Sequence, residues 1–381
     1  MGVSMRTMTN HHDIDLLEAR RSLYALLAQC YLHPPDWATL ATLRSIPDIA
    51  DAVPATSDAL ERLQVEYEYV FGQNAYPYES LYIDHDLMLN TAAAHRVAQL
   101  CQDCGLTVDV PVGAPDHLGV ELRLMAHLLS VESAAWREKN PALQTWSRAQ
   151  QYRCLVHHLA RWAPVFLRVV ERVADHPLYR TLAQVTLELV LNDLEQSVSL
   201  PPWIPLDHRR DGATALPEKI DAKTQRRAIS QSILSATGEA GAAPDERAGS
   251  TSFVWSHDDE ERDLNQIVRC LIVPDIAGMF LSRRDISGLG RRLGIRAPMR
   301  ERAQMMRDLF DAAARFDLLP ALLDHLDELF ATEFWRLAVL TERYPAWTTH
   351  AQQWLSRLDR SREMVQELRT QFLAYHAREA G

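Results

Sequence analysis

The stretch PDHLGVELRLMAHLL, residues 115–129, decides the fold class. Its apolar residues recur at spacings of three and four, so they share one face of a helix. These residues are Leu118, Leu122, Met125 and Leu129. The preceding segment VPVGAPDH, residues 110–117, is rich in residues that interrupt helices and strands, and it sets the start of this helix. The stretch therefore predicts a strong amphipathic helix that buries one apolar face in a core.

The same periodicity runs through most of the chain. EARRSLYALLAQCYLHPP, residues 18–35, indicates a first helix that ends at two prolines, with an apolar stripe of Leu16, Leu23, Leu27 and Cys30. No convincing alternating pattern predicts a strand or a hairpin. We therefore expect an all-α fold, a helical bundle with an additional C-terminal helical block. The other expected helices cover residues 58–72, a segment ending near Gly105, 150–174, 178–198, 318–340 and 350–376.

An export signal is the alternative interpretation of residues 18–35, because Arg20 and Arg21 precede a short apolar run. A signal peptide has an uninterrupted apolar core of roughly 7–15 residues and a small residue before its cleavage site. Here acidic residues surround the arginines, and Gln29 stands before Cys30. The helix is the better interpretation, and we expect Arg20 and Arg21 to be ordinary solvated charges.

The composition of the chain changes at Pro201 and Pro202. From there to about residue 257, small, charged and turn-forming residues predominate, which is typical of a flexible linker. One short helix near residues 223–235 is compatible with this composition. We expect three parts: a helical domain over residues 1–200, a linker over 201–257 and a C-terminal helical extension over 258–381. In the last part, Ser282 and Asp285 have the spacing of a helix-capping box.

Charge and composition exclude several classes of protein. The chain has 381 residues and a formal net charge of −11, with 47% hydrophobic and 24% charged residues. An acidic protein is a poor ligand for the nucleic-acid backbone. No apolar run approaches the roughly 18 residues of a membrane span. The five cysteines have no regular spacing, which favours a reduced, cytoplasmic protein over a disulfide framework.

Catalytic and metal-binding motifs are weak in this sequence. Cys101 and Cys104 form a lone CxxC pair at a helix end, whereas a structural zinc site needs four ligands. His117 and Glu121 are four residues apart and could share a metal ion, which keeps a helical metalloenzyme open as an alternative. His157 and His158 are adjacent and therefore lie on different helix faces. No phosphate-binding loop or nucleophile motif is present. We expect a binding protein without catalytic residues, metal or cofactor.

The segment EYEYVFGQNAYPYESLY, residues 66–82, contains five tyrosines, one phenylalanine and three carboxylates. Aromatic rings provide rigid apolar area with a polar tip, and carboxylates can receive arginines through charge-assisted bonds. This composition suits the binding of a basic, partly apolar peptide. About half of these rings are expected to belong to the core, Tyr67 and Phe71 partly among them.

Together these segments resemble the TorD/DmsD/NarJ family of cytoplasmic chaperones for molybdenum-cofactor redox enzymes. The likeness covers roughly residues 15–200: the first helix, the EYEYVFG segment, PYESLY, a helix ending at Gly105 and PDHLGVELRLMAHLL follow in that order. The resemblance implies an all-helical chaperone that binds the twin-arginine leader or the apoprotein of a molybdopterin oxidoreductase until the cofactor of that enzyme is loaded. It also implies that the client enzyme serves anaerobic respiration. A homodimer is an open alternative to a monomer.

The resemblance also implies a set of leader-binding residues. Glu79 and Asp116 would receive the leader arginines, aromatic rings would receive its apolar part, and His117 would orient the loop. The whole set is Tyr67, Phe71, Tyr78, Glu79, Tyr82, Pro115, Asp116 and His117. Two alternatives stay open. Asp116 can be the N-cap of the following helix with His117 on the surface of its first turn, and the protein can be a permanent assembly subunit instead of a transient chaperone.

Overall fold

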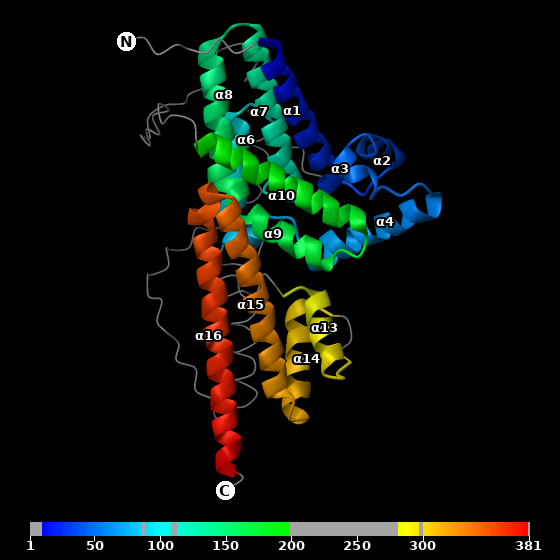
Figure 1. Cartoon of the computed structure of the whole chain (residues 1–381), viewed down its shortest axis with the longest axis vertical. Coiled ribbons are helices and arrows are strands. Elements are labelled where there is room, and N and C mark those ends of the chain that lie inside the picture. Colours follow the sequence, from blue (N-terminus) through cyan, green and yellow to red (C-terminus); the bar gives the residue numbers. More distant parts are fainter. Residues whose placement is uncertain (1–9, 85–88, 108–112, 199–280, 297–299, 380–381) are drawn as a thin grey trace.

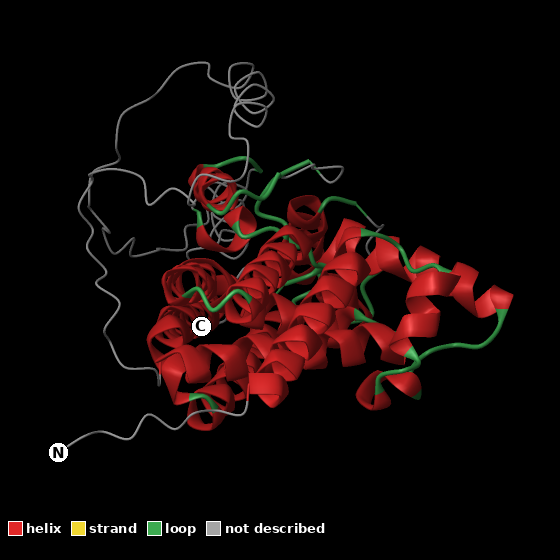
Figure 2. Ribbon diagram, turned by 90° about the horizontal axis from the view of Figure 1, so that it is seen from above, coloured by secondary structure: helices red, strands yellow, loops and turns green. Residues whose placement is uncertain are grey.

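The computed structural model describes residues 10–84, 89–107, 113–198, 281–296 and 300–379. Within these ranges every regular element is a helix, joined to the next by loops (Figure 2). The all-α prediction is confirmed. The expected linker at 201–257 and the first part of the expected C-terminal extension lie outside the described residues, so the three-part division stays a prediction.

The N-terminal bundle is built around the helix that the sequence predicted most strongly, α7 (Leu118–Arg137). The four residues of its apolar stripe are all fully buried. Helix α1 (Asn10–Leu32) lies alongside α7, and three further helices complete the bundle (Figure 1). These are α8 (Pro141–Cys154), α9 (Ala160–Val173) and α10 (Pro177–Val198).

Helices α1 and α7 approach each other closely because residue 119 is a glycine. A Cβ atom at Gly119 would lie 2.5 Å from Leu32 Cγ and 2.9 Å from the carbonyl oxygen of Ala28. Such distances are far inside van der Waals contact, so no side chain fits between these helices at this point. The glycine in the motif PDHLG thus fixes how α7 leaves the loop that precedes it.

Two expectations for the first helix were wrong. Leu16, placed in its apolar stripe, is 56% exposed, whereas Leu27 is fully buried and Cys30 is buried. Arg20 is not an ordinary solvated charge: its Nη2 donates to Asp193 Oδ2 of α10 at 2.7 Å, and the Tyr24 hydroxyl donates to the same oxygen at 2.8 Å. Arg20 therefore joins α1 to α10 through a largely buried ion pair, while Arg21 pairs with the nearby Glu18 at 2.7 Å.

Short elements between α1 and α7 carry the aromatic segment. Helix α4 (Ser57–Tyr69) ends in a π-helical turn, η1 (Val70–Asn74). The chain then passes through the segment YPYES, residues 76–80, into α5 (Ser80–Ile83); this segment is called the YPYES loop. Helices α2, α3 and α4 extend to one side of the bundle (Figure 1). The elements are α2 (Trp37–Leu43), α3 (Pro47–Ala50), α4 (Ser57–Tyr69), η1 (Val70–Asn74), α5 (Ser80–Ile83) and α6 (Ala92–Asp103).

The segment expected as one helix over residues 150–174 is interrupted. A second π-helical turn, η2 (Leu155–Leu159), separates α8 from α9, and Pro164 lies inside α9. Proline has no N–H group, so the carbonyl group four residues earlier, that of Ala160, loses its helical donor. This carbonyl becomes available to a group from outside the helix.

The C-terminal block consists of α13 (Arg283–Arg292), α14 (Arg302–Arg315), α15 (Leu319–Arg343), η5 (Pro345–Trp347) and α16 (Thr348–Glu379). The predicted capping box of Ser282 and Asp285 is confirmed at the start of α13. Helices α15 and α16 form a long antiparallel pair whose closed end lies against the N-terminal bundle (Figure 1). In the part of the chain that the structure describes, no helix has the length and apolarity needed to cross a membrane.

Candidate functional site

Main-chain contacts join the YPYES loop to the PDH segment. The N–H group of Glu79 donates to the Asp116 carbonyl at 3.0 Å, and that of Leu118 donates to the Pro77 carbonyl at 2.8 Å. The rings of Tyr78 and His117 meet edge to face with 5.0 Å between their centroids. Two segments that are almost forty residues apart in the sequence therefore form one structural unit, which is the candidate site.

Asp116 holds this unit together from inside. Its side chain is fully buried, and its Oδ2 accepts from the Ser80 N–H group at 2.7 Å, which satisfies a free donor at the start of α5. The other oxygen, Oδ1, is buried and accepts no hydrogen bond. The expectation that Asp116 is the N-cap of α7 was wrong by one residue, because the Ser80 N–H group is the donor that the carboxylate meets.

The N-cap of α7 is His117, whose Nδ1 accepts from the Gly119 N–H group at 3.0 Å. The side chain is buried, so the expectation of a first-turn surface residue was also wrong. Burial lowers the pKa of His117 from 6.5 to about 3, and the nearby His33 adds to this shift. The imidazole is therefore neutral at physiological pH, as it must be for Nδ1 to accept a hydrogen bond.

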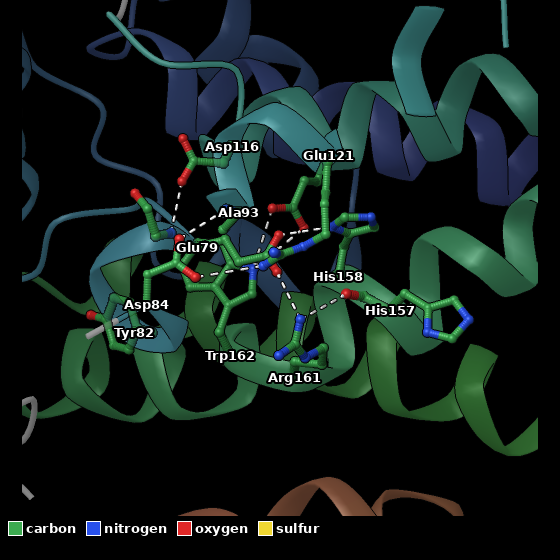
Figure 3. A network of polar contacts seen from close by, with 12 residues as sticks. Glu79, Tyr82, Asp84, Ala93, Asp116, Glu121, His157, His158, Arg161 and Trp162 are labelled. Atoms are coloured by element: carbon green, nitrogen blue, oxygen red, sulfur yellow. Dashed lines mark hydrogen bonds and ion pairs between the residues drawn. The ribbon is translucent and has the colours of Figure 1, made fainter. Parts of the chain in front are cut away.

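Glu79 points from the YPYES loop toward the π-helical turn η2 and the start of α9 (Figure 3). It is fully buried, and its Oε2 lies 2.8 Å from His158 Nδ1. Its Oε1 accepts no hydrogen bond, and the nearest cation, Arg161 Nη1, is 3.5 Å away. Glu79 and Asp116 thus each have one buried carboxylate oxygen without a hydrogen-bond donor.

A third carboxylate, Glu121, completes the buried acidic group. The Trp162 indole Nε1 donates to both of its oxygens, at 3.3 and 3.4 Å. Full burial raises the pKa of Glu121 well above 4.5, and the charges of Glu79 and Asp116 raise it further. This environment favours the protonated form of Glu121.

Sequence reasoning missed the partners of these carboxylates. These partners lie in η2 and α9: they are His158, Arg161 and Trp162. In the sequence, only the spacing of three between His158 and Arg161 indicates that these two share a helix face. The π-helical turn then shifts the register of that face. Such turns are frequent at functional sites, but no residue pattern in the sequence predicts this one.

The predicted aromatic residues divide into a floor and a rim. Tyr67, Phe71 and Tyr82 form the floor: they are buried and belong to one cluster of rings with Phe166, in which the Tyr67 and Phe71 centroids are 5.0 Å apart. The expectation that Tyr67 and Phe71 are partly core is confirmed. Tyr78 and Pro115 are half-buried, so they form the accessible rim of the unit.

The described residues contain no group of three or more histidine, cysteine or acidic side chains placed to hold a metal ion. Cys101 and Cys104 are buried free thiols at the end of α6, and burial raises the pKa of each to about 12. Thiols with such pKa values are poor nucleophiles and poor metal ligands at neutral pH.

The fold and the site define an all-helical domain whose buried acidic group lies under a half-exposed aromatic loop. Residues 38–168 match the family model of the nitrate reductase delta subunit. The chaperone protein TorD of two Vibrio cholerae serotype O1 strains is 31% identical over 121 residues, which cover 32% of this chain and 53% of the relative. The chain thus spans about half the length of the curated relatives it matches. Residues 38–168 are therefore similar to the TorD/NarJ family.

Proposed function

We propose that this protein is a cytoplasmic chaperone for the maturation of a molybdopterin-containing oxidoreductase. It binds the twin-arginine leader or the apoprotein of that enzyme, assists cofactor insertion and delays export until folding is complete. It catalyses no reaction itself. The proposal is supported by the family of residues 38–168 and by the name of the matched relatives, which are chaperones.

The observation that carries the leader-binding part of the proposal is the pair of unsatisfied oxygens, Glu79 Oε1 and Asp116 Oδ1. A buried acceptor without a donor is costly, and a guanidinium group supplies several donors in a planar fork. The two carboxylates come from the two motif segments that the main chain joins. Arg161 pairs with Glu79 Oε1 at 3.5 Å without a hydrogen bond, so leader arginines would supply the hydrogen-bond donors that the two oxygens do not have.

The aromatic rim supplies the apolar part of the interface. Tyr76 is 39% exposed, and Tyr78 and Pro115 beside it are half-buried. Such rings bind apolar segments with little loss of side-chain entropy. Because Glu79 and Asp116 are themselves buried, binding of an arginine requires the YPYES loop and α5 to move away from the PDH segment.

Calorimetric titration of the purified protein with a twin-arginine leader peptide tests the proposal. Glu79→Gln removes the charge and keeps the shape, and we expect it to weaken leader binding by about tenfold or more, as the loss of a charge-assisted hydrogen bond does. A leader with both arginines changed to lysine should lose a similar amount, because lysine cannot form the planar fork.

The matched control is Glu61→Gln, which removes the same charge from an exposed position on α4. Its leader affinity should equal that of the wild-type protein. If binding is indifferent to both Glu79→Gln and the lysine leader, the carboxylates of this site do not bind the arginines, and that part of the proposal is wrong.

A further inference from the structure

The C-terminal block packs directly on the floor of the candidate site. Tyr82 contacts Trp162 of its own domain at a centroid distance of 5.3 Å and Trp354 of α16 at 6.3 Å. Its carbonyl oxygen accepts from Arg357 Nη1 at 3.1 Å. Tyr82 is therefore enclosed from two sides, and one of these sides belongs to a part of the chain outside the family match at 38–168.

Two tryptophans attach this block to the start of α9. The Trp347 indole donates to the Ala160 carbonyl at 2.8 Å, and the Trp354 indole donates to the Arg161 carbonyl at 2.8 Å. The Ala160 carbonyl is available because Pro164 offers it no helical donor. Pro164 thus leaves the Ala160 carbonyl free to accept a hydrogen bond. Trp347, which lies outside residues 38–168, donates that bond.

The segment Trp347–Arg357 shares two features with a leader: it has an arginine and an apolar face. It is helical, its Trp347 and Trp354 rings are almost fully buried against α9, and Arg357 lies over the Trp354 ring with 4.5 Å to the centroid. The segment thus presents a cation and an apolar face to the same floor. An amphipathic helix in a groove is a recurrent mode of peptide recognition.

We propose that the segment Trp347–Arg357 is an intramolecular competitor of the client leader. It occupies the floor around Tyr82, and the leader gains this surface only when the segment separates from α9. The inference rests on the proposed function and adds a regulation of the same site. The apparent affinity for the leader is then reduced by the fraction of molecules in which the segment is docked.

The contact between the block and the bundle combines buried rings with charged pairs. Beside the two indoles, it is fastened by Arg172 of α9, which makes a bidentate pair with Asp285 of α13 at 2.9 and 3.0 Å. Arg172 also lies 2.8 Å from Glu333 of α15. The interface therefore joins apolar burial to charged pairs, as contacts between domains of one chain commonly do.

The test compares leader affinities of full-length variants. Changing Trp347→Phe and Trp354→Phe together removes both indole donors and keeps most of the apolar area. We expect the double variant to bind a twin-arginine leader about tenfold more tightly, the change produced by losing two hydrogen bonds of ordinary strength. The matched control is Trp335→Phe on α15, a tryptophan that is 67% exposed, and its leader affinity should equal that of the wild-type protein.

Hydrogen exchange of the unaltered protein gives a second measurement that needs no variant. Saturating leader peptide should lower the protection of residues 345–360 and leave α1 and α7 unchanged. Equal leader affinity in the wild-type protein and the double variant, with protection at 345–360 retained, would overturn the inference and leave the proposed function standing. Absence of leader binding in both proteins would overturn the proposed function and the inference with it.

Discussion

The contact between α1 and α7 and the contact between α9 and the C-terminal block hold the molecule together by different means. The first is close and mostly apolar, with Gly119 against the backbone of Ala28. The second depends on two indole hydrogen bonds and on the buried cation of Arg172. Apolar packing stabilises a permanent core, whereas a paired buried charge mainly fixes one arrangement among alternatives. The comparison distinguishes a helix contact set by close approach from a contact whose arrangement is fixed by polar groups.

The largest effect is expected at Arg172. Arg172→Ala leaves Asp285 and Glu333 without their shared cation, and Glu333 is almost fully buried. Removing one partner of a buried ion network costs about 3–5 kcal/mol, because Asp285 loses its cation and Glu333 keeps only the partly exposed Arg336. Urea denaturation should show this loss in the free energy of unfolding.

Arg369→Ala is the control for this prediction. Arg369 pairs with Asp324 between α16 and α15, and the two side chains are 44% and 54% exposed. An exposed pair contributes less than about 1 kcal/mol. If the two variants lose similar stability, Arg172 is not a buried fastening, and the proposed difference between the two contacts disappears.

A smaller effect is expected at Gly119, on the other side of the comparison. Gly119→Ala places a Cβ atom against Leu32 and the Ala28 carbonyl, which forces α1 and α7 apart. Overpacking of this kind costs about 1–3 kcal/mol. Thermal denaturation followed by circular dichroism measures the loss.

Gly288→Ala in α13 is the matched control, because a Cβ atom there meets nothing closer than 4.0 Å. With no steric clash, alanine should stabilise this helix by about 0.5–1 kcal/mol through its higher helix propensity. Opposite signs for the two glycines would confirm that close approach, not backbone freedom, explains Gly119. A stabilising Gly119→Ala would contradict the close contact of α1 with α7.

The parts of the fold that could be predicted are those with a local cause. The apolar stripe of α7 and the capping box of α13 were predicted correctly because helical spacing and capping chemistry act over a few residues. The role of Arg20 was predicted incorrectly, because its partner Asp193 is 173 residues away. Leu16 was placed in the stripe by spacing alone, although it is exposed on α1.

The candidate site shows the same limit. The polar residues Glu79, Asp116 and His117 were singled out correctly as members of one unit, but nothing in their sequence indicated that all three are buried. Glu79 meets His158 of η2, and the neighbouring Tyr82 packs against Trp354 of α16. These contacts link segments that are 79 and about 270 residues apart, beyond the reach of periodicity.

The smallest effect is expected at His117, where α7 begins beside the candidate site. The pKa of His117 is 6.5 when unfolded and about 3 when folded, so between these values only the unfolded chain binds the proton. The contribution of His117 to the free energy of unfolding is fully present above pH 6.5. It falls with decreasing pH, by about 1 kcal/mol between pH 7 and pH 5.5.

His117→Asn keeps a side-chain acceptor for the Gly119 N–H group without titrating, so its unfolding free energy should fall less over this range. His117→Ala should lose the same pH dependence and, in addition, about 1 kcal/mol at every pH, because the cap is gone. Equal pH profiles for the wild-type protein and His117→Asn would show that the folded imidazole binds protons as readily as the unfolded one, and His117 would then not be a buried cap of α7.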